Sequence, residues 1–226
     1  MYQEKKIIQA IKNSFEKYKE YGARSTQKLL PIHKFMADTL KEIWGKKYEI
    51  HYLSESSKEA TIEGKYYPKD VDIAVLKGGT PVFCLGIKFI TSNYKQNANN
   101  YFENMMGETA NIQAKQIPYA HIIIMRYQTP YYKKNDPVTP SKIEVINEKD
   151  ITKYLKLIYD VPQAHRPNEL CIFLVNIDEK TGKVTKTNLE RGFGKQFAKL
   201  ITEKLSPENF FKQIENYKRY YEIKKR

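Results

Sequence analysis

Two charged residues stand inside apolar, strand-like stretches of the chain. In "DVDIAVL" the acid Asp72 lies between Val71 and Ile73, and "VFCLGIKFI" contains Gly86 and Lys88. Side chains alternate across a strand, so Asp72 points away from the side that Val71 and Ile73 face, while Gly86 and Lys88 share one face. An acid in an apolar strand costs free energy unless it binds a metal or a cationic partner. A carboxylate that holds a divalent cation, with a lysine beside it, suits phosphodiester hydrolysis.

This pair of strands resembles the PD-(D/E)xK nuclease superfamily, which includes most type II restriction endonucleases. The resemblance covers roughly residues 33–127. It implies that Asp72 is the metal-binding aspartate and Lys88 the motif lysine. "PKDVD" differs from a plain Pro-Asp, so Asp70 is a second candidate for the aspartate. At position 86 the family has Asp or Glu, whereas this chain has Gly86.

In a subset of restriction enzymes the second acid comes from the helix that follows the strand. The motif is then a small residue, any residue, Lys and, after about a dozen residues, Glu. "GIKFITSNYKQNANNYFE" is similar, with Gly86, Lys88 and Glu103. The resemblance thus implies catalytic Asp72, Lys88 and Glu103, with Asp72 and Glu103 as ligands of Mg²⁺. Gly86 leaves space for a helix carboxylate, and Gly107, one turn past Glu103, would allow close helix–sheet approach.

Three other acids are alternatives for the second ligand. Glu108 lies five residues beyond Glu103 and therefore on a different part of the helix surface. Glu63 belongs to the strand that precedes Asp72, and Glu42 to the second predicted helix. Because each could bring a carboxylate to the end of the Asp72 strand, the sequence leaves the choice open.

Polar and basic side chains in two segments are suited to nucleic acid. The first, "TSNYKQNANN", offers amides that can pair with adenine and a lysine for phosphate. The second, "ARSTQK", lies ahead of a helix start, where phosphate binds well. The expected DNA contacts are Arg24, Ser25, Lys28, Asn93, Tyr94, Lys95, Gln96, Asn97, Asn99 and Asn100. The matching loop of the migrated-acid enzymes carries arginines that are absent here, so their base preference does not carry over.

Hydrophobic periodicity predicts the elements that position these residues. Helical spacing and helix signals, among them Pro31 and Gly45, predict helices over 3–20, 31–45, 97–116, 148–160, 188–205 and 206–226. Strand patterns and turns predict strands over 47–55, 59–79 with a turn near Pro68, 82–90, 120–127 and 169–178. The core order is α-β-β-β-α-β, an antiparallel meander followed by a helical crossover.

These elements predict one α/β (mixed α+β) domain over residues 1–226. Its expected centre is a restriction-endonuclease-like core, a mixed sheet flanked by helices, with helical additions at the N-terminus and αβαα additions at the C-terminus. The only linker-like segment, residues 129–142, is too short and central to separate two cores.

Net charge, apolar runs and cysteine content indicate the kind of partner and the cellular compartment to expect. A net charge of +13 indicates a polyanionic partner, of which nucleic acid is the commonest. The absence of a long apolar run argues against a membrane span, and two cysteines in apolar stretches indicate buried thiols in a cytoplasmic protein.

The expected function is therefore a Mg²⁺-dependent type II endodeoxyribonuclease that cuts double-stranded DNA. A palindromic site would be matched by a homodimer, and a cognate DNA methyltransferase is a candidate partner. Two alternatives stay open: a structure-specific or repair nuclease of the same fold, and a DNA-binding protein without catalysis.

Overall fold

A mixed six-stranded sheet forms the centre of the computed structural model, which describes residues 3–136 and 138–224. Its strands, in spatial order, are β1 (Glu49–Tyr52), β4 (Ile73–Lys77), β5 (Thr80–Ile90), β6 (Tyr119–Arg126), β9 (Leu170–Ile177) and β10 (Val184–Lys186). Strands β1, β4 and β5 are antiparallel, β5, β6 and β9 are parallel, and β10 returns antiparallel to β9. The fold is a mixed α/β protein, as the sequence predicts.

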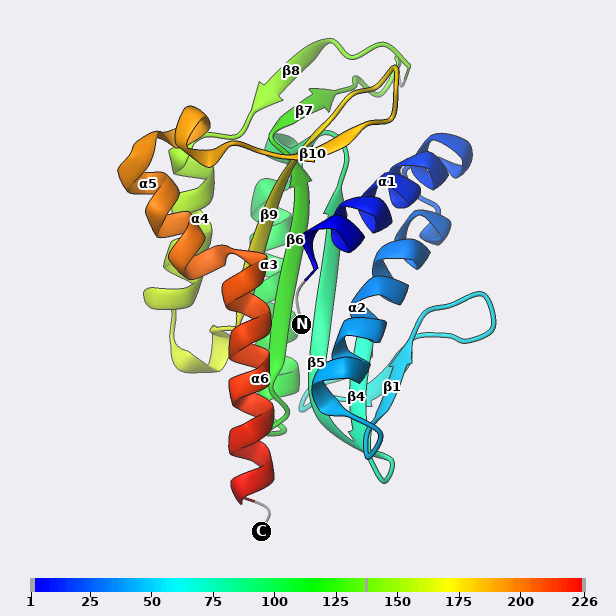
Figure 1. The fold of residues 1–226 in the computed structure, drawn as a ribbon, viewed down its shortest axis with the longest axis vertical. Coiled ribbons are helices and arrows are strands. Elements are labelled where there is room, and N and C mark those ends of the chain that lie inside the picture. The colour runs from blue at the N-terminus through cyan, green and yellow to red at the C-terminus, as the bar shows by residue number, and fades with distance from the viewer. Residues whose placement is uncertain (1–2, 137, 225–226) are drawn as a thin grey trace.

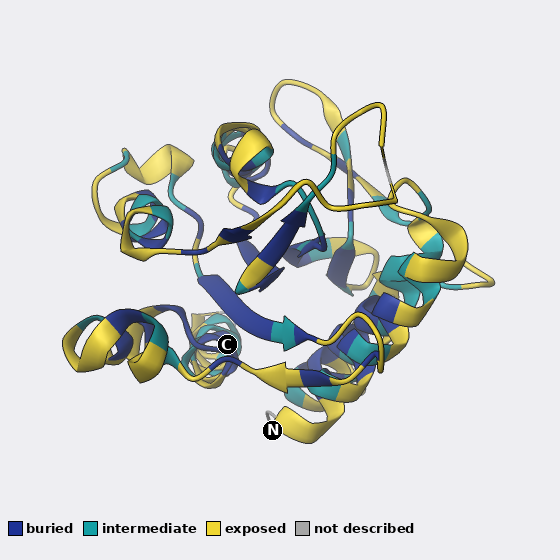
Figure 2. Cartoon of the chain, turned by 90° about the horizontal axis from the view of Figure 1, so that it is seen from above, coloured by how far each residue is buried: buried dark blue, intermediate teal, exposed yellow. Residues whose placement is uncertain are grey.

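Helices cover both faces of this sheet (Figure 1). One face packs against α1 (Glu4–Tyr21), α2 (Leu30–Trp44) and α6 (Pro207–Lys224). The other packs against α3 (Tyr94–Gln113), α4 (Glu148–Tyr159) and α5 (Leu189–Leu205). Short 3₁₀ turns lie at η1 (Thr26–Leu29) and η2 (Gln163–His165). Figure 2 shows buried strands between helices whose outer surfaces are exposed.

The two central strands are buried along their whole length because both faces are covered. Every residue of β6 is buried, and β9 is buried except for Asn176. These are the strands that the sequence marks by continuous apolar runs, which is typical of parallel strands between two helical layers. The helix signals hold as well, since Pro31 lies in the first turn of α2 and Gly45 ends that helix with a φ of +79°.

Strands β4 and β5 of the main sheet stop pairing at one end, and the candidate site lies there. The antiparallel pairing of β4 with β5 ends at Ile73 and Leu85. Beyond it, β3 (Pro68–Val71) pairs instead with β2 (Ala60–Glu63) as a separate two-stranded ribbon. We call this divergence the fork: residues 71–73 on one side and residues 85–87 on the other. Asp72 is the residue between β3 and β4, at the centre of the fork.

Some elements differ from the sequence prediction. The segment 59–79 forms three strands rather than one interrupted strand, and its turn lies at residues 64–67, ahead of Pro68. Helix α3 begins at Tyr94, three residues before the predicted start. A second ribbon, β7 (Gln128–Tyr131) with β8 (Lys142–Val145), encloses much of the proline-rich stretch, whose residue 137 lies outside the described residues.

Among the described residues, none of the helices has the length and apolar character needed to cross a membrane.

Candidate metal and catalytic centre

Asp72 takes the place of a missing strand partner at the fork. Because β3 has left the sheet, the backbone N–H of Ile87 has no strand neighbour on that side, and it donates to Asp72 Oδ2 at 2.7 Å. The Asp72 side chain keeps only 21% of its surface exposed. Burial raises the pKa of Asp72 to about 6, although the hydrogen bond from Ile87 and the charge of Lys88 act in the opposite direction. A divalent cation would displace the proton from such a carboxyl.

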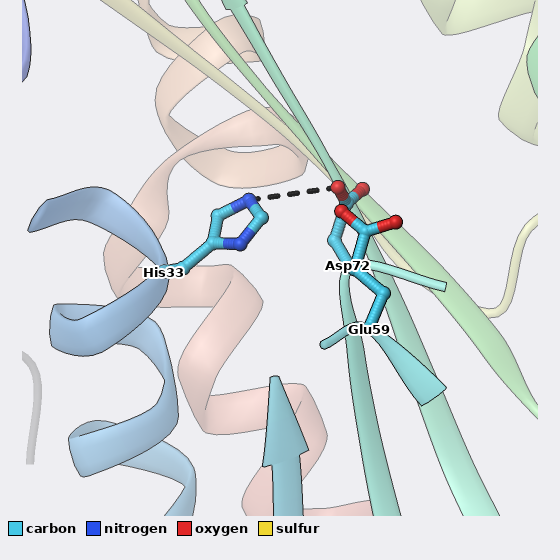
Figure 3. Close-up of side chains that lie close together, drawn as sticks. All are labelled: His33, Glu59 and Asp72. Carbon is cyan, nitrogen blue, oxygen red and sulfur yellow. Dashed lines mark ion pairs between the residues drawn. The ribbon is translucent and has the colours of Figure 1, made fainter. Parts of the chain in front are cut away.

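His33 and Glu59 approach Asp72 from two other elements (Figure 3). One ligand atom from each of the three residues lies within 4.8 Å of the others. Ligands on opposite sides of one ion, with bonds of about 2.1 to 2.4 Å, would be roughly 4.2 to 4.8 Å apart. His33 belongs to α2 and Glu59 to the loop before β2. The group therefore has the size of a cation site.

The imidazole of His33 is in the form that a metal requires. Its side chain is fully buried, and burial lowers its pKa to about 4, so it is neutral at pH 7. Its Nε2 lies 3.5 Å from Asp72 Oδ1, and neither ring nitrogen has a hydrogen-bond partner among the described residues. A buried polar group without a partner costs free energy, and coordination would satisfy it. Burial, and then the charge of Asp72, raise the pKa of Glu59.

Lys88 faces a carboxylate on α3, and that carboxylate belongs to Glu108. Glu108 Oε1 lies 3.2 Å from Lys69 Nζ and 3.8 Å from Lys88 Nζ. Burial alone would raise the pKa of Glu108, but the nearby positive charges, chiefly Lys88, hold that pKa below its ordinary value. The carboxylate is ionised near neutral pH. It also acts electrostatically on Asp72, raising the Asp72 pKa.

The space that a strand carboxylate would occupy at position 86 is filled by two rings of β6. A Cβ atom on Gly86 would lie 2.7 Å from Nδ1 of His121 and 2.9 Å from the Tyr119 hydroxyl. His121 is fully buried, burial lowers its pKa to about 4, and its Nε2 lies 3.0 Å from Thr109 Oγ1. The Tyr119 hydroxyl donates to Glu108 Oε2 at 3.4 Å. The two rings leave no room for a strand acid, and Tyr119 supports the helix acid.

The predicted catalytic residues are brought together only in part. Asp72, between β3 and β4, and Lys88, on β5 next to the fork, lie close enough for the charge of Lys88 to lower the pKa of Asp72. Glu103 is an exposed residue of α3. Its Cα points about 140° around the helix from that of Glu108, because five residues correspond to about 500°. Gly107 is also exposed, and a Cβ there would meet nothing within 4 Å, so the close packing expected at Gly107 is absent.

The other alternative acids are exposed. Asp70 is exposed and accepts a hydrogen bond from Thr61 at 2.6 Å. Glu63 is exposed at the far end of β2, and Glu42 is exposed on α2, more than two turns beyond His33. Among these acids, Glu108 is the one that the structure places beside Lys88.

The predicted DNA contacts of the 93–100 segment divide into buried and exposed residues. Tyr94 is fully buried in the core, where its hydroxyl meets that of Tyr154, so its ring has no surface to offer to nucleic acid. The Asn93 side chain has a structural role: its amide donates to the Tyr132 carbonyl at 2.8 Å and accepts the Tyr132 N–H at 2.9 Å. Asn97 is half-buried and donates to the Asn93 carbonyl. The exposed members are Lys95, Gln96, Asn99 and Asn100.

The 24–28 segment forms the η1 turn rather than an open clamp. Ser25 caps it by accepting the backbone N–H of Gln27 at 3.2 Å. The ammonium of Lys28 donates to the Ala23 carbonyl, and burial lowers its pKa. Arg24 is exposed and remains a candidate phosphate contact.

Sequence reasoning missed His33, Glu59, Lys69, Tyr119 and His121. His33, Tyr119 and His121 come from α2 and β6, so no local spacing joins them to Asp72 or Lys88. Glu59 and Lys69 belong to the same predicted segment as Asp72, but no motif spacing distinguishes them from its other charged residues. For His33 the sequence did contain a signal. It lies between Ile32 and Met36 on the apolar face of a helix, where a buried imidazole needs a hydrogen-bond or metal partner.

Comparison with known proteins found no matching protein-family model, no matching curated protein and no matching solved structure.

Proposed function

We propose that this protein is a metal-dependent nuclease whose active site is the fork. The observation that carries the proposal is the convergence of two groups on Asp72: the His33–Glu59 pair, of cation-site size, and the Lys88–Glu108 pair on the α3 side. Carboxylates with a neutral imidazole hold a divalent cation, and a lysine beside them meets a phosphate oxygen. The net charge of +13 supports a nucleic-acid substrate.

The residues have separate roles in this proposal. His33, Glu59 and Asp72 hold the cation, which supplies charge stabilisation and an activated water when bound. Lys88 orients the phosphate and stabilises its developing charge. Glu108 replaces Glu103 as the second acid of the motif, and Lys69 and Tyr119 hold it in place. Imidazole ligation favours Mn²⁺ over Mg²⁺ relative to an all-carboxylate site, so both ions are candidates.

The resemblance to the PD-(D/E)xK superfamily supports a more specific proposal, in which a homodimer of the type II restriction class cleaves double-stranded DNA. The experiment is digestion of a mixed-sequence plasmid by the purified chain with Mg²⁺ or Mn²⁺, with an EDTA control. Discrete fragments support a site-specific enzyme, and diffuse products or a preference for branched DNA support a structure-specific nuclease. Metal-independent binding without any cleavage would leave the DNA-binding alternative.

The key variant is Asp72→Asn. The amide can still accept the Ile87 N–H, so the fold should persist, but a neutral oxygen binds a divalent cation weakly. Cleavage should fall at least about 100-fold, since the cation supplies several kcal/mol and each 1.36 kcal/mol is tenfold in rate. Urea unfolding of the variant controls for its stability. Wild-type cleavage by a folded Asp72→Asn protein would overturn the assignment.

A further inference from the structure

The β2–β3 ribbon that carries Glu59 and Asp72 at its base ends in two solvent-facing aromatic rings. We call residues 64–67 the tip. Tyr66 is 71% exposed and Tyr67 is 45% exposed. Single exposed aromatic residues are common on protein surfaces, but two in succession at the end of one ribbon indicate a contact surface.

The tip is fixed to the helix that carries Glu108. The side chain of Asn111, buried in α3, accepts the backbone N–H of Tyr66 at 2.9 Å and that of Tyr67 at 3.3 Å. It also donates to the Tyr67 carbonyl at 2.9 Å, and the Asn111 carbonyl accepts the Lys65 N–H at 2.9 Å. A Cβ on Gly64 would lie 2.1 Å from the Asn111 amide, so the glycine permits this close approach. These bonds fix the backbone of the tip against α3, and with it the points from which the two tyrosine side chains extend.

The tip lies within reach of a nucleic acid bound at the fork. Tyr67 precedes Asp72 by five residues of extended chain, which span about 16 Å. A duplex rises 3.4 Å per base pair on each strand, so the tip reaches bases within about five positions of the cleaved phosphate. Lys65 Nζ lies 5.5 Å from the centre of the Tyr66 ring, and Lys69 lies between the tip and Glu108. Both ammonium groups suit the phosphates that flank such a base.

We propose that Tyr66 and Tyr67 stack on unpaired bases within about five positions of the cleaved phosphate, so that the substrate class is nucleic acid with a locally opened strand. This inference rests on the proposed nuclease function, and of its two forms it selects the structure-specific nuclease over cleavage of a fully paired site. Stacking on tyrosine requires a base whose face is free, which a paired and stacked base lacks. Such stacking tolerates any base, because every base has a flat face. Sequence preference would then come from other contacts.

The test measures binding separately from cleavage. The full chain, in EDTA, is titrated into labelled DNA that is either fully paired or contains a short unpaired bubble with 2-aminopurine. We expect tighter binding to the bubble and a change in 2-aminopurine fluorescence. The double variant Tyr66→Ala, Tyr67→Ala should weaken bubble binding by roughly 5- to 150-fold for each base that loses its stacking partner, and should leave duplex binding within about twofold. Tyr220→Ala, on α6 and 61% exposed, is the matched control and should behave as wild type.

Two results overturn the inference while the nuclease proposal stands. One is unchanged bubble binding by the double tyrosine variant when the wild type still cleaves. The other is an equal loss of affinity for bubble and duplex DNA, which would mean that the tip contacts nucleic acid whether or not its bases are paired. If the wild type neither binds nor cuts any nucleic acid, the proposed function fails and the inference fails with it.

Discussion

Asp72 has a structural role at the fork, and the proposed function gives the same side chain a chemical one. One carboxylate oxygen replaces the strand neighbour that Ile87 loses at the fork, and the other faces His33. Its pKa of about 6 reflects the burial that the first task demands. A carboxyl held in place by the sheet loses little conformational freedom when a cation binds, which favours a site built in advance of its ligand.

The pair Glu108 and Glu103 gives a matched test on one helix. We expect Glu108→Gln to lower cleavage at least about 10-fold, because the charge beside Lys88 and Lys69 is removed and Lys88 is left without its carboxylate. Glu103→Gln should cleave like the wild type, since Glu103 is exposed. The measurement is the initial rate of plasmid cleavage at saturating metal. The opposite pattern, with only Glu103→Gln inactive, would restore Glu103 as the second acid.

Two glycines should respond to alanine with opposite signs. At Gly86 the new Cβ would lie under 3.0 Å from both His121 and Tyr119, so Gly86→Ala should destabilise by about 1 to 3 kcal/mol, the cost of overpacking. At Gly107 the Cβ meets nothing, so Gly107→Ala in the helix should stabilise by up to about 1 kcal/mol. Urea unfolding measures both. Equal effects would mean that the rings at position 86 move aside freely.

The same crowding would also exclude an acidic side chain from position 86 of β5. A Glu at position 86 would have to displace His121 and Tyr119, so Gly86→Glu is not expected to rescue a helix-acid variant. The sequence indicates that the strand acid is missing. The proposed function takes the second acid from α3, and the sequence could not indicate which α3 acid that is, because the choice depends on how α3 is rotated over the sheet and on rings from β6, about 30 residues beyond Gly86.

At the scale of elements, strand patterns and helix signals predict most of the main sheet and the long helices. The ribbons β2–β3 and β7–β8 were not predicted as separate units. Local pattern cannot show that β3 leaves β5 for β2, because Asn111 on α3 and the Asp72–Ile87 bond make that choice through tertiary contact. Similarly, α3 starts at Tyr94 rather than Asn97 because Asn93, with a φ of +51°, is tied to Tyr132.

Helix α4 offers a prediction at this scale. Its first turn is closed by a reciprocal capping box: Asn147 accepts from the Asp150 N–H, and Asp150 accepts from the Asn147 N–H. Asn147→Ala should lower the free energy of unfolding by about 1 kcal/mol. Asn147→Ser keeps a capping oxygen and should remain within a few tenths of a kcal/mol of wild type. Circular dichroism during urea unfolding compares them, and equal losses would show that the cap contributes nothing specific.

For the whole molecule, Glu169 gives stability a distinctive pH dependence. Burial raises the pKa of Glu169 from an ordinary 4.5 to about 7. Between these values the folded chain holds a proton that the unfolded chain has released, so the free energy of unfolding falls as pH rises through this window. At about 1.36 kcal/mol per pH unit, the shift from 4.5 to about 7 sets an upper limit of about 3.4 kcal/mol on this loss.

Glu169→Gln removes that titration. The variant should gain stability over the wild type at pH 8 and lose this gain at pH 5, where Glu169 is protonated in the folded chain. Thermal unfolding at the two pH values measures the difference. A gain of equal size at both would show that the substitution acts through packing and not through charge.

The bond between the Ile87 amide and Asp72 also supplies a spectroscopic reporter. One backbone proton points directly at the carboxylate on which the proposed chemistry depends, and it lies in a strand that stays paired to β6 at that residue. In a two-dimensional NMR spectrum the Ile87 resonance should therefore shift when Asp72 gains a proton near pH 6 and shift differently when it gains a divalent cation. A single assigned peak would follow occupancy of the site without any substrate.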